Sequence, residues 1–228
     1  MDDARHTHDA DCDGSWVERE ALARAAGTPL PKRGGRRREV DMPGEDEVRA
    51  AVRTLIRWTG DNPEREGLVD TPDRVMRSYR EMYAGYDVDP REYLERTFEE
   101  VGGYDELIVL RDIRFVSVCE HHMLPVIGKA HVAYLPTDRV VGISKLARVV
   151  RGYALRLQHL LDGAGDLGRH LLLDLQPQGV GVVIEAEHSC MTLRGVNAPG
   201  TSLTTSHLLG VIRDDARTRE EFLRFVRG

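Results

Sequence analysis

Apolar and polar residues alternate with a helical period from Glu45 onward. Apolar side chains recur every three or four positions up to a Gly-Asp-Asn-Pro sequence at 60–63, which predicts that a first helix ends there. A Thr-Pro pair at 71–72 predicts the start of a second helix that runs towards Tyr83. The folded part of the chain is therefore expected to open with two helices.

Three β-branched runs predict strands over 107–118, 130–135 and 180–186. Between the last two, a long helix is expected from about Ser144, with that residue as its cap. Its apolar positions recur at helical spacing and are Leu146, Val149, Val150, Tyr153 and Leu157. Helices that precede and separate the strands predict an α+β fold.

The first 44 residues differ from the rest, because they are polar, contain Gly and Pro, and carry a basic cluster at 32–38. We predict a disordered tail over 1–44, with at most a short helix over Trp16–Ala26, and one folded domain over 45–228. The tail contains metal-binding residue types, namely His6, His8, Asp11 and Cys12. A solvated tail is favoured over an adventitious metal site or a nucleic-acid contact.

Composition is consistent with a soluble enzyme but does not identify one. The 228 residues are 41% hydrophobic and 31% charged, enough for one sizeable domain plus a tail. No apolar run approaches the roughly 18 residues of a membrane span, and the N-terminus lacks signal-peptide features, so we expect a cytoplasmic protein. The net charge of −6 weakly opposes nucleic-acid binding, and three cysteines do not suggest a disulfide framework.

Two clusters of metal-binding residue types stand out, Cys119-Glu-His-His122 and, later, His188-Ser-Cys190. A Cys-x-x-His pair alone is weak evidence, because buried cysteine is common. The second cluster follows a strand-like run, so His188 and Cys190 should point the same way. Thiolate and imidazole are preferred zinc ligands, and a catalytic zinc uses three of them. We predict Cys119, His122 and Cys190 as zinc ligands, with His121 and His188 left for acid–base chemistry.

Two cations lie early in the long predicted helix, Lys145 and Arg148. Residues three apart share a helix face, and the N-terminal end of a helix attracts anions. They could therefore bind an anionic substrate, although a solvated charged face is the more usual role of an isolated Lys-x-x-Arg.

The segments around these residues resemble a known family. Residues 116–150 read VSVCEHHMLPVIGKAHVAYLPTDRVVGISKLARVV, and residues 176–196 read QPQGVGVVIEAEHSCMTLRGV. Together with DNPEREGLVDTPDRV at 61–75, they are similar to GTP cyclohydrolase I, the zinc enzyme that opens pteridine biosynthesis. The resemblance spans roughly residues 47–228.

The resemblance implies the tunnelling fold, in which subunits associate into a closed β-barrel. It also implies a homodecamer of two pentameric rings, with active sites at subunit interfaces. Lys145, Arg148 and Arg194 would hold the triphosphate of GTP, and Arg74 is a further candidate. His121 and His188 would move protons while water attacks C8 at the zinc. Formate is released, and the ribose, with help from Ser144, rearranges and recloses as 7,8-dihydroneopterin triphosphate.

One segment departs from the family pattern. The family commonly has Arg-Leu-Gln-Val-Gln-Glu-Arg-Leu-Thr where this chain has RLQHLLDGA at 156–164. An ungapped match places Leu160 and Leu161 at the Gln and Glu positions, and that Glu accepts the guanine N1 and 2-amino hydrogens. A leucine cannot accept them. Asp162 or Asp166 could compensate, or the two leucines could simply extend an apolar helix face.

Three functions therefore stay open. The first is a working GTP cyclohydrolase I in which another residue reads the base, and GTP is the default substrate. The second is a specialised paralogue that hydrolyses a different purine nucleotide or stops at a ring-opened product. The third is a non-catalytic regulatory subunit, which the retained zinc, histidine and phosphate positions disfavour.

Overall fold

The structure is a computed structural model and describes residues 41–99, 103–158 and 162–228, without the side chains of 162 and 163. The predicted tail lies almost wholly outside the described residues, as do Cys12 and the possible helix over Trp16–Ala26. Leu160 and Leu161 also lie outside them.

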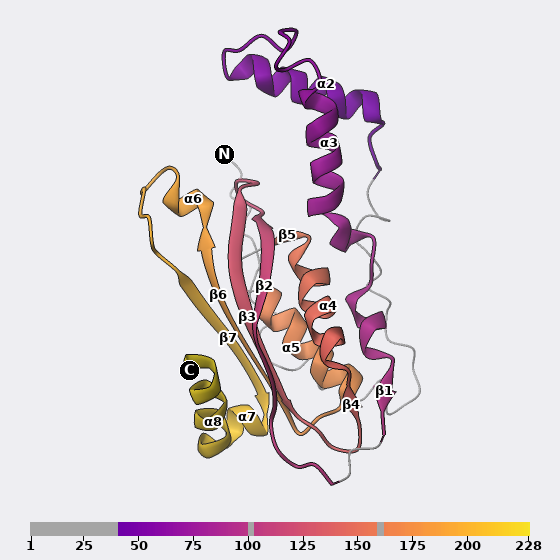
Figure 1. Cartoon of the computed structure of the whole chain (residues 1–228), viewed down its shortest axis with the longest axis vertical. Coiled ribbons are helices and arrows are strands. Elements are labelled where there is room, and N and C mark those ends of the chain that lie inside the picture. The colour runs from indigo at the N-terminus through magenta and orange to yellow at the C-terminus, as the bar shows by residue number, and fades with distance from the viewer. Residues whose placement is uncertain (1–40, 100–102, 159–161) are drawn as a thin grey trace, which may run out of the picture.

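The described chain begins with a helical arm. Helix α2 (Glu45–Trp58) packs against α3 (Thr71–Met82), and the Arg49 Nε donates a hydrogen bond to Asp73 Oδ1 at 2.8 Å. Both helices match the predicted ones. In Figure 1 the arm stands at the end of the molecule, with α3 leading down towards the sheet. Two 3₁₀ turns follow, η2 (Ala84–Tyr86) and η3 (Pro90–Leu94).

An antiparallel sheet forms the centre of the fold, with the strand order β5-β2-β3-β6-β7. The strands are β2 (Ile108–Cys119), β3 (Pro125–Leu135), β5 (Leu157–Gln158), β6 (Gly179–His188) and β7 (Leu203–Gly210). Short β5 pairs parallel with the end of β2, and β1 (Thr97–Phe98) pairs with β4 (Val140–Val141) as a separate ribbon. The three predicted strands are confirmed as β2, β3 and β6, whereas β7 was not predicted.

Helices cover both faces of the sheet (Figure 1). Helices α4 (Ile143–Ala154) and α5 (Asp162–Leu175) lie over one face, where Tyr134, Leu146 and Leu171 are fully buried. Helices α7 (Val211–Asp214) and α8 (Ala216–Arg227) pack on part of the other face. A Cβ at Gly181 would lie 2.7 Å from the Phe222 ring, so glycine at this position lets α8 approach. These layers confirm the α+β fold.

Two expectations for the helix near Ser144 are wrong. The N-cap is Gly142, and Ser144 lies inside the first turn. The helix also ends at Ala154, because the chain beyond it bonds elsewhere: the Arg156 guanidinium donates to Gly85 O at 2.9 Å and Val88 O at 3.1 Å. Leu157 N donates to the Tyr86 hydroxyl at 3.2 Å, and β5 then pairs with β2. The expected long helix is therefore split into α4, β5 and α5.

Among the described residues, no helix is long and apolar enough to cross a membrane.

Candidate active site

Three metal-binding side chains meet at one end of the sheet. Cys119 ends β2, His188 ends β6, and Cys190 lies in the short helix α6 (Ser189–Thr192). Strand β3 pairs with both β2 and β6 and places Val126 opposite Ser117 on one side and His188 on the other. The sulfur and imidazole ligand atoms all lie within 4.8 Å of one another. This Cys–His–Cys group could hold a metal ion.

His122 lies beside this group without belonging to its closest set. Its Nδ1 is 3.9 Å from Cys119 Sγ, and its Nε2 is 3.2 Å from the Nη1 of Arg194. The turn that carries it is closed by a hydrogen bond from Met123 N to Cys119 O at 2.8 Å. The set predicted from sequence and the closest set in the structure share both cysteines and differ in the histidine. The structure thus brings four candidates and Arg194 together.

His121 points to a more open environment. Its side chain is 53% exposed, and its Nε2 lies 3.6 Å from the Glu120 carboxylate. The His121 and His122 rings are 6.3 Å apart, centroid to centroid. Glu120 had not been singled out from the sequence, although it directly precedes His121.

Burial shapes the electrostatics of the group. It lowers the pKa of His188, because desolvation disfavours the imidazolium. It also raises the pKa of the Cys190 thiol, with a further rise from the neighbouring Cys119. Burial therefore favours the neutral forms of His188 and Cys190. A soft divalent metal would supply the positive charge that two adjacent thiolates need.

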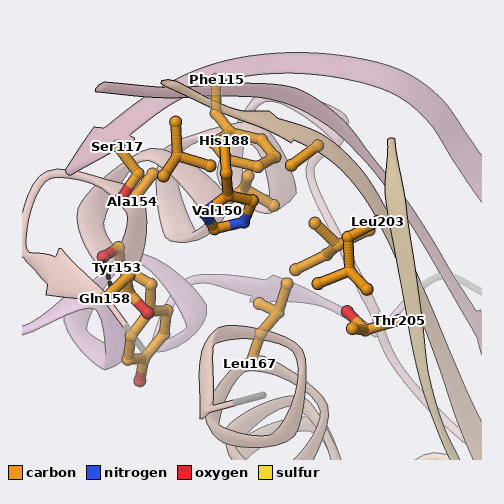
Figure 2. Close-up of a pocket in the computed structure, with 13 residues that line it drawn as sticks. Phe115, Ser117, Val150, Tyr153, Ala154, Gln158, Leu167, His188, Leu203 and Thr205 are labelled. Carbon is orange, nitrogen blue, oxygen red and sulfur yellow. Dashed lines mark hydrogen bonds between the residues drawn. The ribbon is translucent and has the colours of Figure 1, made fainter. Parts of the chain in front are cut away.

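A pocket adjoins the Cys–His–Cys group, and Figure 2 shows the His188 imidazole projecting into it. Leu167 lies below the imidazole in this view, with Leu203 and Thr205 to one side and Tyr153 and Gln158 to the other. The wall is mainly apolar, and its other polar side chain is Ser117. His188 thus belongs to both the metal-binding group and the pocket wall.

The predicted phosphate-binding cations of α4 lie away from the metal-binding group. The C-terminal end of α4 is near it, since Ser117 Oγ donates to Arg156 O at 3.4 Å and Gln158 pairs with Cys119. Lys145 lies nine residues before the end of α4, which corresponds to about 14 Å along the helix axis. Ser144 and Arg148 lie in the same half of the helix, and both are exposed.

The two remaining candidates contribute no contact to the group that the structure describes. Arg74 lies in the first half of α3 and pairs with Asp70 at 3.2 Å, with both side chains largely exposed. Asp162 is the first residue of α5, and its side chain is outside the described part of the structure.

Comparison with known proteins assigns the family. A model of the GTP cyclohydrolase I family matches residues 48–227. The chain belongs to the GTP cyclohydrolase I family. Similar relatives include GTP cyclohydrolase 1 of Allorhizobium ampelinum, 49% identical over 82% of this chain and 94% of that protein. GTP cyclohydrolase 1 of Brucella suis is 48% identical over 81% of this chain and 87% of its own length, and that of Sinorhizobium fredii is 48% identical over 82% and 91%.

Membership of the GTP cyclohydrolase I family makes this chain a hydrolase and its α+β sheet an example of the tunnelling fold. It also implies GTP as the substrate and an oligomeric assembly. The pocket residues Ser117, Tyr153, Gln158 and Thr205 were missed from the sequence, because they come from four separate elements or connections. Of these, only Gln158 carries a sequence signal, since it directly precedes the divergent segment.

Proposed function

We propose that the protein is a zinc-dependent cyclohydrolase that converts GTP and water to 7,8-dihydroneopterin triphosphate and formate. The observation that carries this proposal is the double position of His188, in the Cys–His–Cys group and in the wall of the adjoining pocket. A purine in the pocket would present its imidazole ring to the metal-binding group. Membership of the GTP cyclohydrolase I family supports the same reaction.

The side chains fit zinc, because two sulfur atoms and nearby imidazoles form the soft donor set that this ion prefers. We assign Cys119, His122 and Cys190 as the ligands. Bound zinc would supply Lewis-acid chemistry and make water a usable nucleophile at neutral pH. The assignment leaves His188, which projects into the pocket, in contact with the substrate rather than with the ion.

His121 and His188 are the proposed proton-transfer residues. An imidazole can accept a proton from the hydrated C8 and deliver one to the ring nitrogen as the C8–N bond breaks. Two waters enter as C8 leaves as formate, and one water leaves when the ring recloses, so the net reaction consumes one water. Arg194, next to His122, would bind a phosphate oxygen of the substrate.

The position of α4 supports a site that is shared between subunits. Lys145 and Arg148 would bind the triphosphate from a neighbouring chain, and Ser144 would act there during the sugar rearrangement. A homodecamer of two pentamers is the assembly we expect. Arg74, on the exposed helical arm, is a further candidate for an interface contact with the substrate.

The test is product analysis. Purified, zinc-loaded protein is incubated with GTP, and formate and pterin fluorescence are followed against a Cys190→Ser control of the same oligomeric state. Both products should form with the native protein alone. Formate without pterin would mean that the reaction stops at a ring-opened product. The absence of both would refute GTP as the substrate and favour either a different purine nucleotide or a non-catalytic subunit.

A second candidate is hydrolysis of a different purine nucleotide. It is favoured by the pocket, where the described lining residues include no carboxylate to accept the two guanine donors. Comparing formate release from several purine nucleoside triphosphates distinguishes the two candidates.

A further inference from the structure

The pocket beside the metal-binding group has only uncharged polar groups and a histidine among its described lining residues. They are Ser117, Tyr153, Gln158, Thr205 and His188, and the remainder are apolar. Among the described residues, the groups that can recognise a base in this pocket are therefore neutral hydrogen-bonding groups and the imidazole of His188.

Apart from His188, Gln158 is the polar lining residue whose backbone is joined directly to the metal-binding group. In the short parallel pairing of β5 with β2, Gln158 is the partner of Cys119. Its carbonyl oxygen also accepts a hydrogen bond from Glu120 N at 3.2 Å. The backbone of Gln158 is thus held directly beside a proposed zinc ligand, while its side chain lines the pocket.

The orientation of the Gln158 amide follows from its partner. Its Nε2 donates a hydrogen bond to Tyr153 O. Because a carbonyl can only accept, the NH₂ group must face Tyr153, and Oε1 is left as the acceptor for a ligand. Tyr153 is a rigid support, since it is 6% exposed, its hydroxyl bonds to His170 Nδ1, and the Arg156 guanidinium lies 5.3 Å from its ring centroid.

A single neutral acceptor recognises a base differently from a carboxylate. The guanine edge presents two adjacent donors, N1–H and the 2-amino group, which match the two oxygens of a carboxylate. One amide oxygen matches one N–H, and a neutral hydrogen bond is about half as strong as a charge-assisted one. Recognition through Gln158 would thus read N1–H and be nearly indifferent to the 2-amino group.

We propose that Gln158 Oε1 reads the N1–H of the base, and that the enzyme accepts 6-oxopurine nucleoside triphosphates with or without a 2-amino group. This inference rests on the proposed cyclohydrolase function and names its substrate class. Guanosine and inosine triphosphates are both substrates. Adenosine triphosphate is a poor one, because its N1 lone pair would face the amide oxygen.

The experiment compares kcat/KM for GTP, ITP and ATP, with formate release as the readout because it does not depend on which pterin forms. For the native enzyme, the values for GTP and ITP should agree within roughly tenfold, the effect of one neutral hydrogen bond. Gln158→Glu should raise the preference for GTP over ITP to about a hundredfold or more, since a carboxylate can accept both guanine donors. Gln158→Met should weaken both substrates.

Gln178→Glu is the matched control. Its amide also donates to a main-chain carbonyl, that of Pro136, at 3.1 Å. Gln178 precedes β6, at the end of that strand opposite His188. The Gln178→Glu variant therefore loses the same kind of hydrogen bond at a site away from the pocket. Its ratio of kcat/KM for GTP to that for ITP should equal the ratio of the native enzyme.

Two results would overturn the inference. One is a preference of the native enzyme for GTP over ITP of a hundredfold or more. The other is a GTP-to-ITP ratio of kcat/KM that is the same in Gln158→Glu as in Gln178→Glu. If no nucleotide releases formate, the proposed function fails, and calorimetric binding then decides the inference. Dissociation constants for GTP and ITP within tenfold of each other would support neutral recognition. A difference of more than tenfold between the two dissociation constants, or no binding of either GTP or ITP, would refute the inference.

Discussion

The position of α4 leads to a quantitative prediction about whether each active site is shared between two subunits. Lys145 lies at the end of α4 remote from the metal-binding group, about 14 Å along the axis from Ala154 at the near end. If one active site takes its zinc from one chain and its triphosphate-binding cations from another, two inactive variants can complement each other. Cys190→Ser removes a proposed zinc ligand, and Lys145→Ala removes a proposed phosphate contact.

The size of the effect follows from counting. Each shared site has a zinc-binding part from one chain and a cationic part from its neighbour. In a randomly mixed oligomer with equal amounts of both variants, half of the zinc-binding parts and half of the cationic parts are intact. Because each site needs both parts to be intact, about a quarter of the sites are complete. Mixed oligomers should therefore show about a quarter of native activity, whereas each variant alone shows almost none.

The assay uses co-expression with two different affinity tags, sequential purification of mixed oligomers, and formate release from GTP. Each variant co-expressed with a differently tagged copy of itself is the control. Mixed oligomers with no more activity than these controls would contradict the reasoning, because sites contained within one chain cannot be restored by mixing.

Three further predictions concern histidines. His122→Ala should lower the zinc content measured by mass spectrometry far more than His188→Ala does, and the opposite order would reassign the third ligand to the residue in the closest set. His121→Ala should retain zinc and oligomeric state but lose roughly 10²–10⁴-fold in turnover, and native turnover would exclude a proton-transfer role. Burial lowers the pKa of His131 and His170 below the ordinary 6.5, so the unfolded chain binds more protons and the free energy of unfolding should decrease as the pH falls below 6.5. His131→Asn should reduce the change in the free energy of unfolding per pH unit, measured by denaturation titrations. An unchanged pH dependence would show that burial of the His131 imidazole does not cause it.

Much of the fold could be predicted from local sequence. The helical period after Glu45 and the Thr-Pro pair at 71–72 fix α2 and α3, because amphipathic spacing and N-terminal proline act over a few residues. The β-branched runs likewise fix β2, β3 and β6. Strand β7, with a mixed sequence, takes its conformation mainly from pairing with β6, which no local pattern reveals.

In the candidate site too, some features follow from the sequence alone and others from the tertiary structure. The sequence by itself determined which residues carry metal-binding side chains, since Cys119, His122, His188 and Cys190 are identified by residue type and spacing. It also showed the departure at Leu160 and Leu161, and the family to which the chain belongs. These are properties of residue identity, which the sequence contains completely.

Only the tertiary structure decided where those residues lie relative to one another. Apolar spacing continues through Leu157, yet α4 ends at Ala154, because Arg156 bonds to carbonyls about seventy residues earlier in the chain. That break pairs Gln158 with Cys119, orients its amide on Tyr153 and leaves Lys145 at the remote end of the helix. Helix periodicity depends on near neighbours, whereas these contacts depend on segments that only folding brings together.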